Sequence, residues 1–101
     1  MMQTVYEASI DTIAKHYGLD HQQMKTIEEL GEAGSAIARH VLEPGDANLE
    51  HMAEELADVQ IMIDQLLVLS PMLKFHFERQ KYKKIKRQIR RMVEDARLNV
   101  D

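Results

Sequence analysis

Long stretches without a helix-breaking residue dominate this 101-residue chain. Its two prolines, Pro44 and Pro71, stand in or beside short polar breaks, and between the breaks apolar residues recur at spacings of three and four. That spacing places them on one face of an α-helix, whereas a half-buried β-strand would alternate apolar and polar residues. No β-type alternation stands out. The sequence therefore predicts an all-α fold.

Four helical segments are expected, over about residues 5–16, 22–42, 49–69 and 71–99. Gly18 ends the first, and Asp20 followed by Gln23 forms a capping-box pattern at the start of the second. Asn48 is suited to cap the third, and Pro71 suits the first turn of the basic C-terminal helix. The length indicates one domain over residues 1–101, built as a four-helix bundle with a single core.

Apolar residues on the second and third helices predict both a core and an assembly. On the second helix we expect a buried stripe with helical spacing, made of Met24, Ile27, Leu30, Gly34, Ile37 and Val41. The third helix is apolar on nearly every side after Asp58. Because its sequence neighbour can cover only one side, we expect a homodimer or homotetramer in which a two-fold partner covers the remainder.

Composition excludes several classes of protein. The absence of cysteine removes disulfides, thiolate metal sites and cysteine nucleophiles. No apolar stretch reaches the roughly 18 residues of a membrane span, and no signal peptide is visible at the N-terminus. We therefore expect a cytoplasmic protein with no membrane partner.

An internal repeat stands out against this background. Residues 28–33, Glu-Glu-Leu-Gly-Glu-Ala, recur 26 positions later in residues 54–59 as Glu-Glu-Leu-Ala-Asp-Val. Two helices joined by a short turn lie antiparallel, so each would bring its acidic box to a similar level. Glu29 and Glu32 then face Glu55 and Asp58.

Four converging carboxylates would repel one another unless they bind a cation. Oxygen ligands alone suit a hard ion, Mg²⁺ or Mn²⁺, better than Zn²⁺. The plain alternative is a solvated acidic face, because acidic residues near a helix start complement the helix dipole. Asp58 favours the metal site, since its surroundings in sequence are apolar and an unpartnered buried acid is costly.

Glu-x-x-Glu on one helix followed by Glu-x-x-Asp on the next resembles the MazG-like nucleotide pyrophosphohydrolases, across roughly residues 20–91. The resemblance implies an all-α enzyme that hydrolyses nucleoside triphosphates to the monophosphate and pyrophosphate, which is a nucleotide-pool cleaning activity. It also implies that Glu29, Glu32, Glu55 and Asp58 hold the catalytic Mg²⁺. The related phosphoribosyl-ATP pyrophosphatases are disfavoured, because their second box continues into a Tyr-His pair that is lacking here.

The C-terminal helix carries most of the positive charge, with nine of the 13 basic residues between positions 74 and 91. Lys81, Lys84 and Arg87 lie at helical spacing on one side of this helix, and we expect them to bind the β and γ phosphates. Lys25 is a further candidate for phosphate, and Gln22 for base or sugar. Nucleic-acid binding is disfavoured, since the rest of the chain is strongly acidic.

A different class of function remains open. A non-enzymatic helical bundle, used for interaction or regulation, would pair its acidic and basic helices without any catalysis. A redox di-iron bundle is disfavoured, because the Glu-x-x-His element of such proteins is absent from the sequence. Convergence of the acids on one cavity would favour the enzyme.

Overall fold

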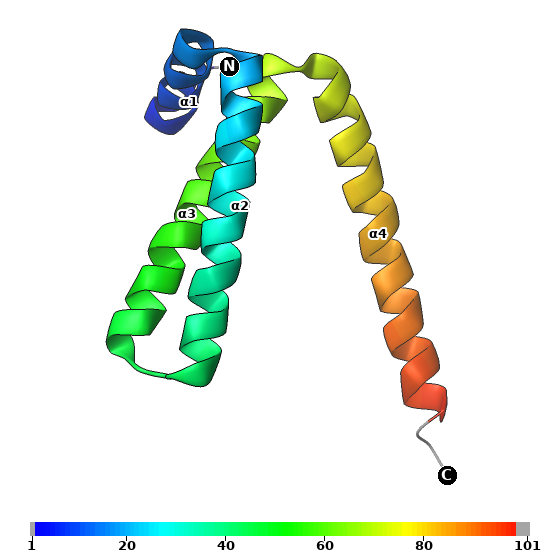
Figure 1. Cartoon of the computed structure of the whole chain (residues 1–101). Coiled ribbons are helices and arrows are strands. Elements are labelled where there is room, and N and C mark those ends of the chain that lie inside the picture. Colours follow the sequence, from blue (N-terminus) through cyan, green and yellow to red (C-terminus); the bar gives the residue numbers. More distant parts are fainter. Residues whose placement is uncertain (1, 99–101) are drawn as a thin grey trace. The chain divides into compact units, whose positions relative to one another are not determined.

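The computed structural model describes residues 2–98, and within that range it contains four α-helices and no strand (Figure 1). This confirms the all-α prediction. The chain divides into two compact units, one ending at Ser70 and the other beginning at Pro71. The single domain over residues 1–101 stays a prediction.

Helix α1, Val5–Tyr17, begins where Thr4 accepts a hydrogen bond from the backbone N–H of Glu7 at 3.0 Å. It ends at Gly18, whose N–H donates to the Ala14 carbonyl at 2.8 Å. Gly18 has φ 85° and ψ 168°, a conformation almost restricted to glycine. The predicted stop at Gly18 is therefore correct.

Helix α2, Leu19–Leu42, follows Gly18 directly. The capping box predicted at Asp20 is wrong, because Asp20 already lies in the first turn and no side chain caps this end. Gly18 alone separates the end of α1 from the start of α2.

We predict that Gly18→Ser lowers the free energy of unfolding by about 1–3 kcal/mol, because a side chain is strained at this φ and ψ. Urea denaturation followed by circular dichroism measures it. Gly45→Ser is the matched control, since Gly45 also precedes a helix but has φ 164°, an extended backbone that any residue adopts. Serine caps helices well, so this control should be neutral or slightly stabilising. Equal losses in both variants would contradict the assignment of strain.

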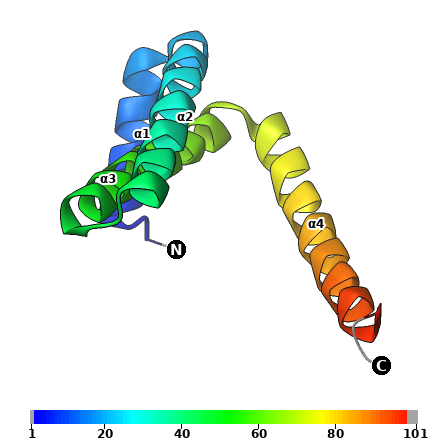
Figure 2. The same ribbon diagram turned by 60° about the horizontal axis from the view of Figure 1, so that its bottom comes forward.

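Helix α3, Asp46–Leu69, begins earlier than the predicted position 49. Asn48 does not cap it; the residue lies in the first turn, and its side-chain amide donates to the Glu43 carbonyl at 2.8 Å. Figures 1 and 2 show α2 and α3 side by side as an antiparallel hairpin, with α1 packed beside them. The hairpin brings the two acidic boxes onto neighbouring helices.

The face of α2 that packs in this unit is small and polar. Its buried residues are Gln22, Thr26, Glu29, Ala33 and Ala36. The core is completed by Ile10 and Ala14 of α1 and by Met62 of α3. Alanine at the contact lets two helix axes approach closely, which suits a hairpin with a short turn.

The apolar stripe predicted as the core of α2 is exposed instead, so that prediction is wrong. The exposed residues include Met24, Ile27, Leu30, Gly34, Ile37 and Val41. Helical periodicity identifies a face suited to burial, but it does not identify which neighbour covers that face. Within the described unit, α3 covers the other side of α2.

A buried pair of amides joins α2 to α3. The Gln22 side chain donates to Gln65 Oε1 at 2.6 Å, and both residues are buried. Gln22 Oε1 in turn accepts from His21 Nδ1 at 2.7 Å, while Thr26 donates to the Gln22 backbone carbonyl at 2.6 Å. Buried amides are costly unless they are paired, so this pair favours one register of the hairpin.

The second unit contains helix α4, Pro71–Leu98, with no buried residue. It begins at Pro71 as predicted, and position 99 of the expected helix lies outside the described residues. Among the described helices, none combines the length and the hydropathy needed for a membrane span.

Candidate metal centre

Three acidic side chains from the two repeated boxes meet between α2 and α3. Glu29 and Glu32 of α2 and Glu55 of α3 each bring one carboxylate oxygen into a group whose members all lie within 4.8 Å of one another. The two glutamates of α2 are one turn apart, and the antiparallel register places Glu55 opposite them. Three negative charges at this spacing repel strongly unless a cation neutralises them.

Burial makes two of these carboxylates unusual. The side chain of Glu29 is only 9% exposed and that of Glu55 only 14%. One oxygen of each, Oε2, is shielded from solvent and has no hydrogen-bond partner. A buried, unpaired carboxylate oxygen costs several kcal/mol by order of magnitude, and a bound cation would offset that cost.

Lys25 provides partial compensation on one side. Its ammonium lies 3.4 Å from Glu29 Oε1 and 3.5 Å from Glu28 Oε2. Glu29, followed by the charge of Glu28, raises the pKa of the Lys25 side chain above its usual value. The lysine is half-buried and reaches only the outer oxygen of Glu29, so the inner oxygen Oε2 still lacks a partner.

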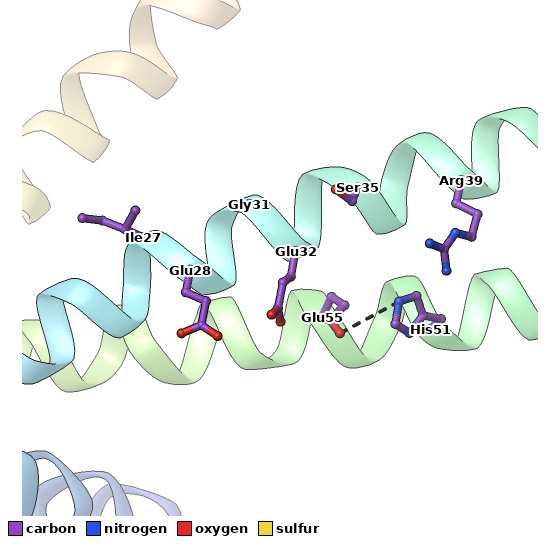
Figure 3. A pocket seen from close by; sticks show the side chains of 8 residues that line it. All are labelled: Ile27, Glu28, Gly31, Glu32, Ser35, Arg39, His51 and Glu55. Atoms are coloured by element: carbon purple, nitrogen blue, oxygen red, sulfur yellow. Dashed lines mark ion pairs between the residues drawn. The ribbon is translucent and has the colours of Figure 1, made fainter.

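An open groove of about 680 Å³ runs along this face of the hairpin (Figure 3). Its lining residues are Ile27, Glu28, Gly31, Glu32, Ser35, Arg39, His51 and Glu55. Figure 3 shows the carboxylates of Glu32 and Glu55 pointing into the space between the helices, with Glu28 beside them. A ligand in the groove would therefore reach two of the three clustered acids directly.

Asp58 lies outside the three-residue cluster and is exposed. The expectation that its apolar neighbours would bury it is wrong. Asp58 lies four and seven positions before the buried Met62 and Gln65, on the same side of α3, yet it is exposed at its own position. Asp58 is still only one turn from Glu55, at the edge of the site.

The other candidate residues fall into two groups. Gln22 is buried and engaged by Gln65, so its side chain faces the helix contact. Lys81, Lys84 and Arg87 are exposed on α4, where Lys81 pairs with Glu78 at 3.5 Å. Because α4 belongs to the second unit, the approach of its cations to the acids stays a prediction.

Arg39 and His51 also line the groove, and neither was among the sequence candidates. His51 Nε2 lies 3.9 Å from Glu55 Oε1, and its Nδ1 lies 3.9 Å from Glu54 Oε2. The i, i+4 spacing from His51 to Glu55 was the only signal of this contact in the sequence. Arg39 is seven residues beyond Glu32 on the same side of α2.

Comparison with protein-family models, with curated proteins and with solved structures finds no match to this chain. The chemistry of the site must therefore be judged from its own residues. Clustered carboxylates, two of which have a buried oxygen without a hydrogen-bond partner, could bind a metal ion.

Proposed function

We propose that this protein is a Mg²⁺-dependent hydrolase that splits nucleoside triphosphates into the monophosphate and pyrophosphate. The observation that carries the proposal is the group formed by Glu29, Glu32 and Glu55, with its unpaired buried oxygens beside an open groove. Acid clusters that serve only as a solvated surface keep their oxygens in water. Here the inner oxygens of Glu29 and Glu55 are removed from water, which a metal ligand tolerates.

The donor set favours Mg²⁺, with Mn²⁺ as a substitute, because all of the donors are carboxylate oxygens. When bound, the ion would neutralise phosphate charge, make an attacking water more acidic and stabilise the pyrophosphate leaving group. Glu29 and Glu55 are the best buried of the three acids and would hold the ion in place. Asp58, one turn from Glu55, would complete the ligand set from the edge.

Glu32 is suited to a different task in the same site. It is the exposed member of the cluster and has no ion pair among residues 2–98. A carboxylate that faces both the groove and the solvent can accept a proton from water and release it again. We assign Glu32 the general-base role in addition to its contact with the ion.

Cleavage between the α and β phosphates rests on the resemblance to MazG-like pyrophosphohydrolases and not on geometry. The paired acidic motif supports that resemblance, and the convergence of three of its four acids agrees with it. A panel of ribo- and deoxynucleoside triphosphates with Mg²⁺, assayed for released pyrophosphate, tests the proposal. Turnover of at least one nucleotide is expected, whereas inactivity across the panel would favour the non-enzymatic bundle.

The exposed apolar part of α2 that carries Leu30, Ile37 and Val41 favours a second proposal, that a second copy of this chain covers this part. Leu30, Ile37 and Val41 are 53%, 41% and 70% exposed, and their spacing of seven and four places them on one side of α2. An apolar stripe of this length is rare on a stable monomer. A two-fold partner presenting the same stripe would cover both copies at once, giving a homodimer or a tetramer built from dimers.

Ile37→Lys should convert the assembly to a monomer of 11.7 kDa, measured by light scattering, without loss of helical circular dichroism. A charge on each copy at the two-fold contact would be desolvated without a partner. Val68→Lys on α3 is the matched control, since Val68 is 37% exposed but lies on another helix. Dissociation by Val68→Lys alone would place the interface on α3 instead.

A further inference from the structure

The groove beside the acid cluster changes character along its length. Ile27 and Gly31 lie toward one end, the carboxylates of Glu32 and Glu55 lie in the middle, and Arg39 with its neighbour His51 lies at the other end (Figure 3). The sequence of environments is therefore apolar, then acidic, then cationic. A symmetric ligand would gain nothing from such an order, but a ligand with an apolar end and an anionic end would.

The cationic end is available for a ligand. Arg39 is exposed and forms no ion pair within the described part of the chain, although it lines the groove that also holds Glu32 and Glu55. Its planar guanidinium can donate two parallel hydrogen bonds to a phosphate. His51 stands beside it, with one ring nitrogen 3.9 Å from Glu55. The two side chains, one from each helix, thus flank the same end of the groove.

The spacing suits a polyphosphate. Seven residues separate Glu32 from Arg39, which corresponds to a rise of roughly 10 Å along α2. The arginine side chain is long enough to reach back over part of that distance. A phosphate chain held beside the carboxylate cluster would therefore extend toward Arg39, while His51 lies one turn from Glu55 on the facing helix.

Gly31 supports placing the base of the nucleotide, and not its phosphates, at the end of the groove beside Ile27. A Cβ at this position would meet nothing within 4 Å, so packing inside the described unit does not require glycine there. Glycine also weakens a helix relative to alanine. The missing side chain leaves the groove wall flat beside the exposed Ile27, as an approaching planar ring would need.

We infer that the groove binds its nucleotide in one direction, with the terminal phosphates on Arg39 and His51 and the base against Ile27 and Gly31. This inference rests on the proposed function, because it takes the carboxylate cluster as the place of the scissile phosphate. The reverse direction would set a phosphate beside Ile27 and the acidic Glu28, where the nearby Lys25 is already paired with Glu28 and Glu29. It would also leave Arg39 without an anion.

The test measures binding without turnover, by calorimetry with Mg²⁺ and inorganic tripolyphosphate. Arg39→Ala should weaken this binding by about tenfold or more, as expected for the loss of hydrogen bonds to a charged group. Arg39→Lys should recover part of it, and His51→Gln should cause a smaller loss. Lys15→Ala on α1, whose lysine pairs with Asp11, is the control and should bind as the wild type does.

A second variant tests the other end. Gly31→Leu places a side chain in open space on a helix that tolerates it, so the fold should persist. Because the new side chain blocks contact with the base, binding of a non-hydrolysable nucleoside triphosphate should weaken by about tenfold. Tripolyphosphate has no base, so its binding should be unchanged. Weaker tripolyphosphate binding in this variant, with wild-type binding in Arg39→Ala, would reverse the direction and overturn the inference.

The outcomes also separate this inference from the proposed function. If the wild-type protein binds tripolyphosphate through Arg39 but hydrolyses no nucleotide, the result would support the phosphate subsite and refute the proposed hydrolase activity. Protein that hydrolyses nucleotides while Arg39→Ala binds tripolyphosphate normally would refute the subsite alone. Wild-type protein that does not bind tripolyphosphate with Mg²⁺ would also overturn the inference.

Discussion

Glu29→Gln is expected to release pyrophosphate about 10²–10³-fold more slowly than the wild type, the range found when one preorganised electrostatic contact is lost. Glutamine keeps the shape of the side chain but removes the charge from the oxygen that is buried without a partner. A steady-state pyrophosphate assay at saturating Mg²⁺ measures the change. Glu50→Gln, an exposed acid on α3 outside the groove, is the control and should retain wild-type turnover.

For the stability of the same variant without metal, we expect no loss, in contrast to the loss of turnover. In the metal-free protein, Glu29→Gln removes one charge from a repulsive cluster and desolvates a neutral amide instead of a carboxylate. Its melting temperature without metal should equal or exceed that of the wild type. Glu55→Gln and Asp58→Asn should lose turnover in the same way. Near-wild-type turnover in Glu29→Gln and Glu55→Gln would refute the assigned site.

The second large effect is stabilisation by metal and nucleotide. Millimolar Mg²⁺ or Mn²⁺, added with a non-hydrolysable nucleoside triphosphate, should raise the melting temperature by about 10–20 °C, given ~2.7 kcal/mol for a ligand at 100 times its Kd. Only the native hairpin brings Glu29, Glu32 and Glu55 together, so the ligands bind the folded state selectively. Differential scanning fluorimetry, with excess EDTA as the reference, measures the shift.

The double variant Glu29→Gln, Glu32→Gln identifies where the metal binds. It retains Glu55 and Asp58 but loses the two acids that α2 contributes to the cluster, so the stabilisation should disappear. If the shift persists in the double variant, the metal binds elsewhere on the chain.

Local sequence signals were sufficient for much of the fold. Gly18 ends α1 and Pro71 begins α4 as predicted, because backbone constraints at these residues act regardless of tertiary context. The meeting of Glu29, Glu32 and Glu55 was also predictable. Two helices of similar length joined by a short turn must pair antiparallel, so a repeat placed symmetrically about the turn comes together.

Features that depend on which neighbour covers a helix were not predictable. The stripe containing Leu30 and Ile37 was expected to be the core, yet α3 packs against the side that carries Ala33 and Ala36. An apolar period of 3.6 residues in the sequence identifies the apolar face of a helix, but it does not identify which element packs against that face. The exposure of Asp58 has the same origin, because apolar neighbours in sequence do not guarantee apolar neighbours in space.

The cationic end of the groove illustrates a different limit. Arg39 and His51 lie 12 positions apart, on different helices, and each looks like an ordinary surface residue in the sequence. Only the register of the hairpin shows that both flank the acid cluster. That register is stabilised in part by the buried amides of Gln22 and Gln65, which the sequence alone did not connect.

Phosphorus NMR of a nucleoside triphosphate incubated with the protein and Mg²⁺ tests the proposed activity most directly, because it identifies both products in one spectrum. Cleavage between the α and β phosphates predicts equal amounts of monophosphate and pyrophosphate, and no reaction when Mg²⁺ is chelated. A diphosphate with free phosphate would place the cut at another bond. An unchanged triphosphate, for every base and sugar tried, would contradict a hydrolase built on Glu29, Glu32 and Glu55.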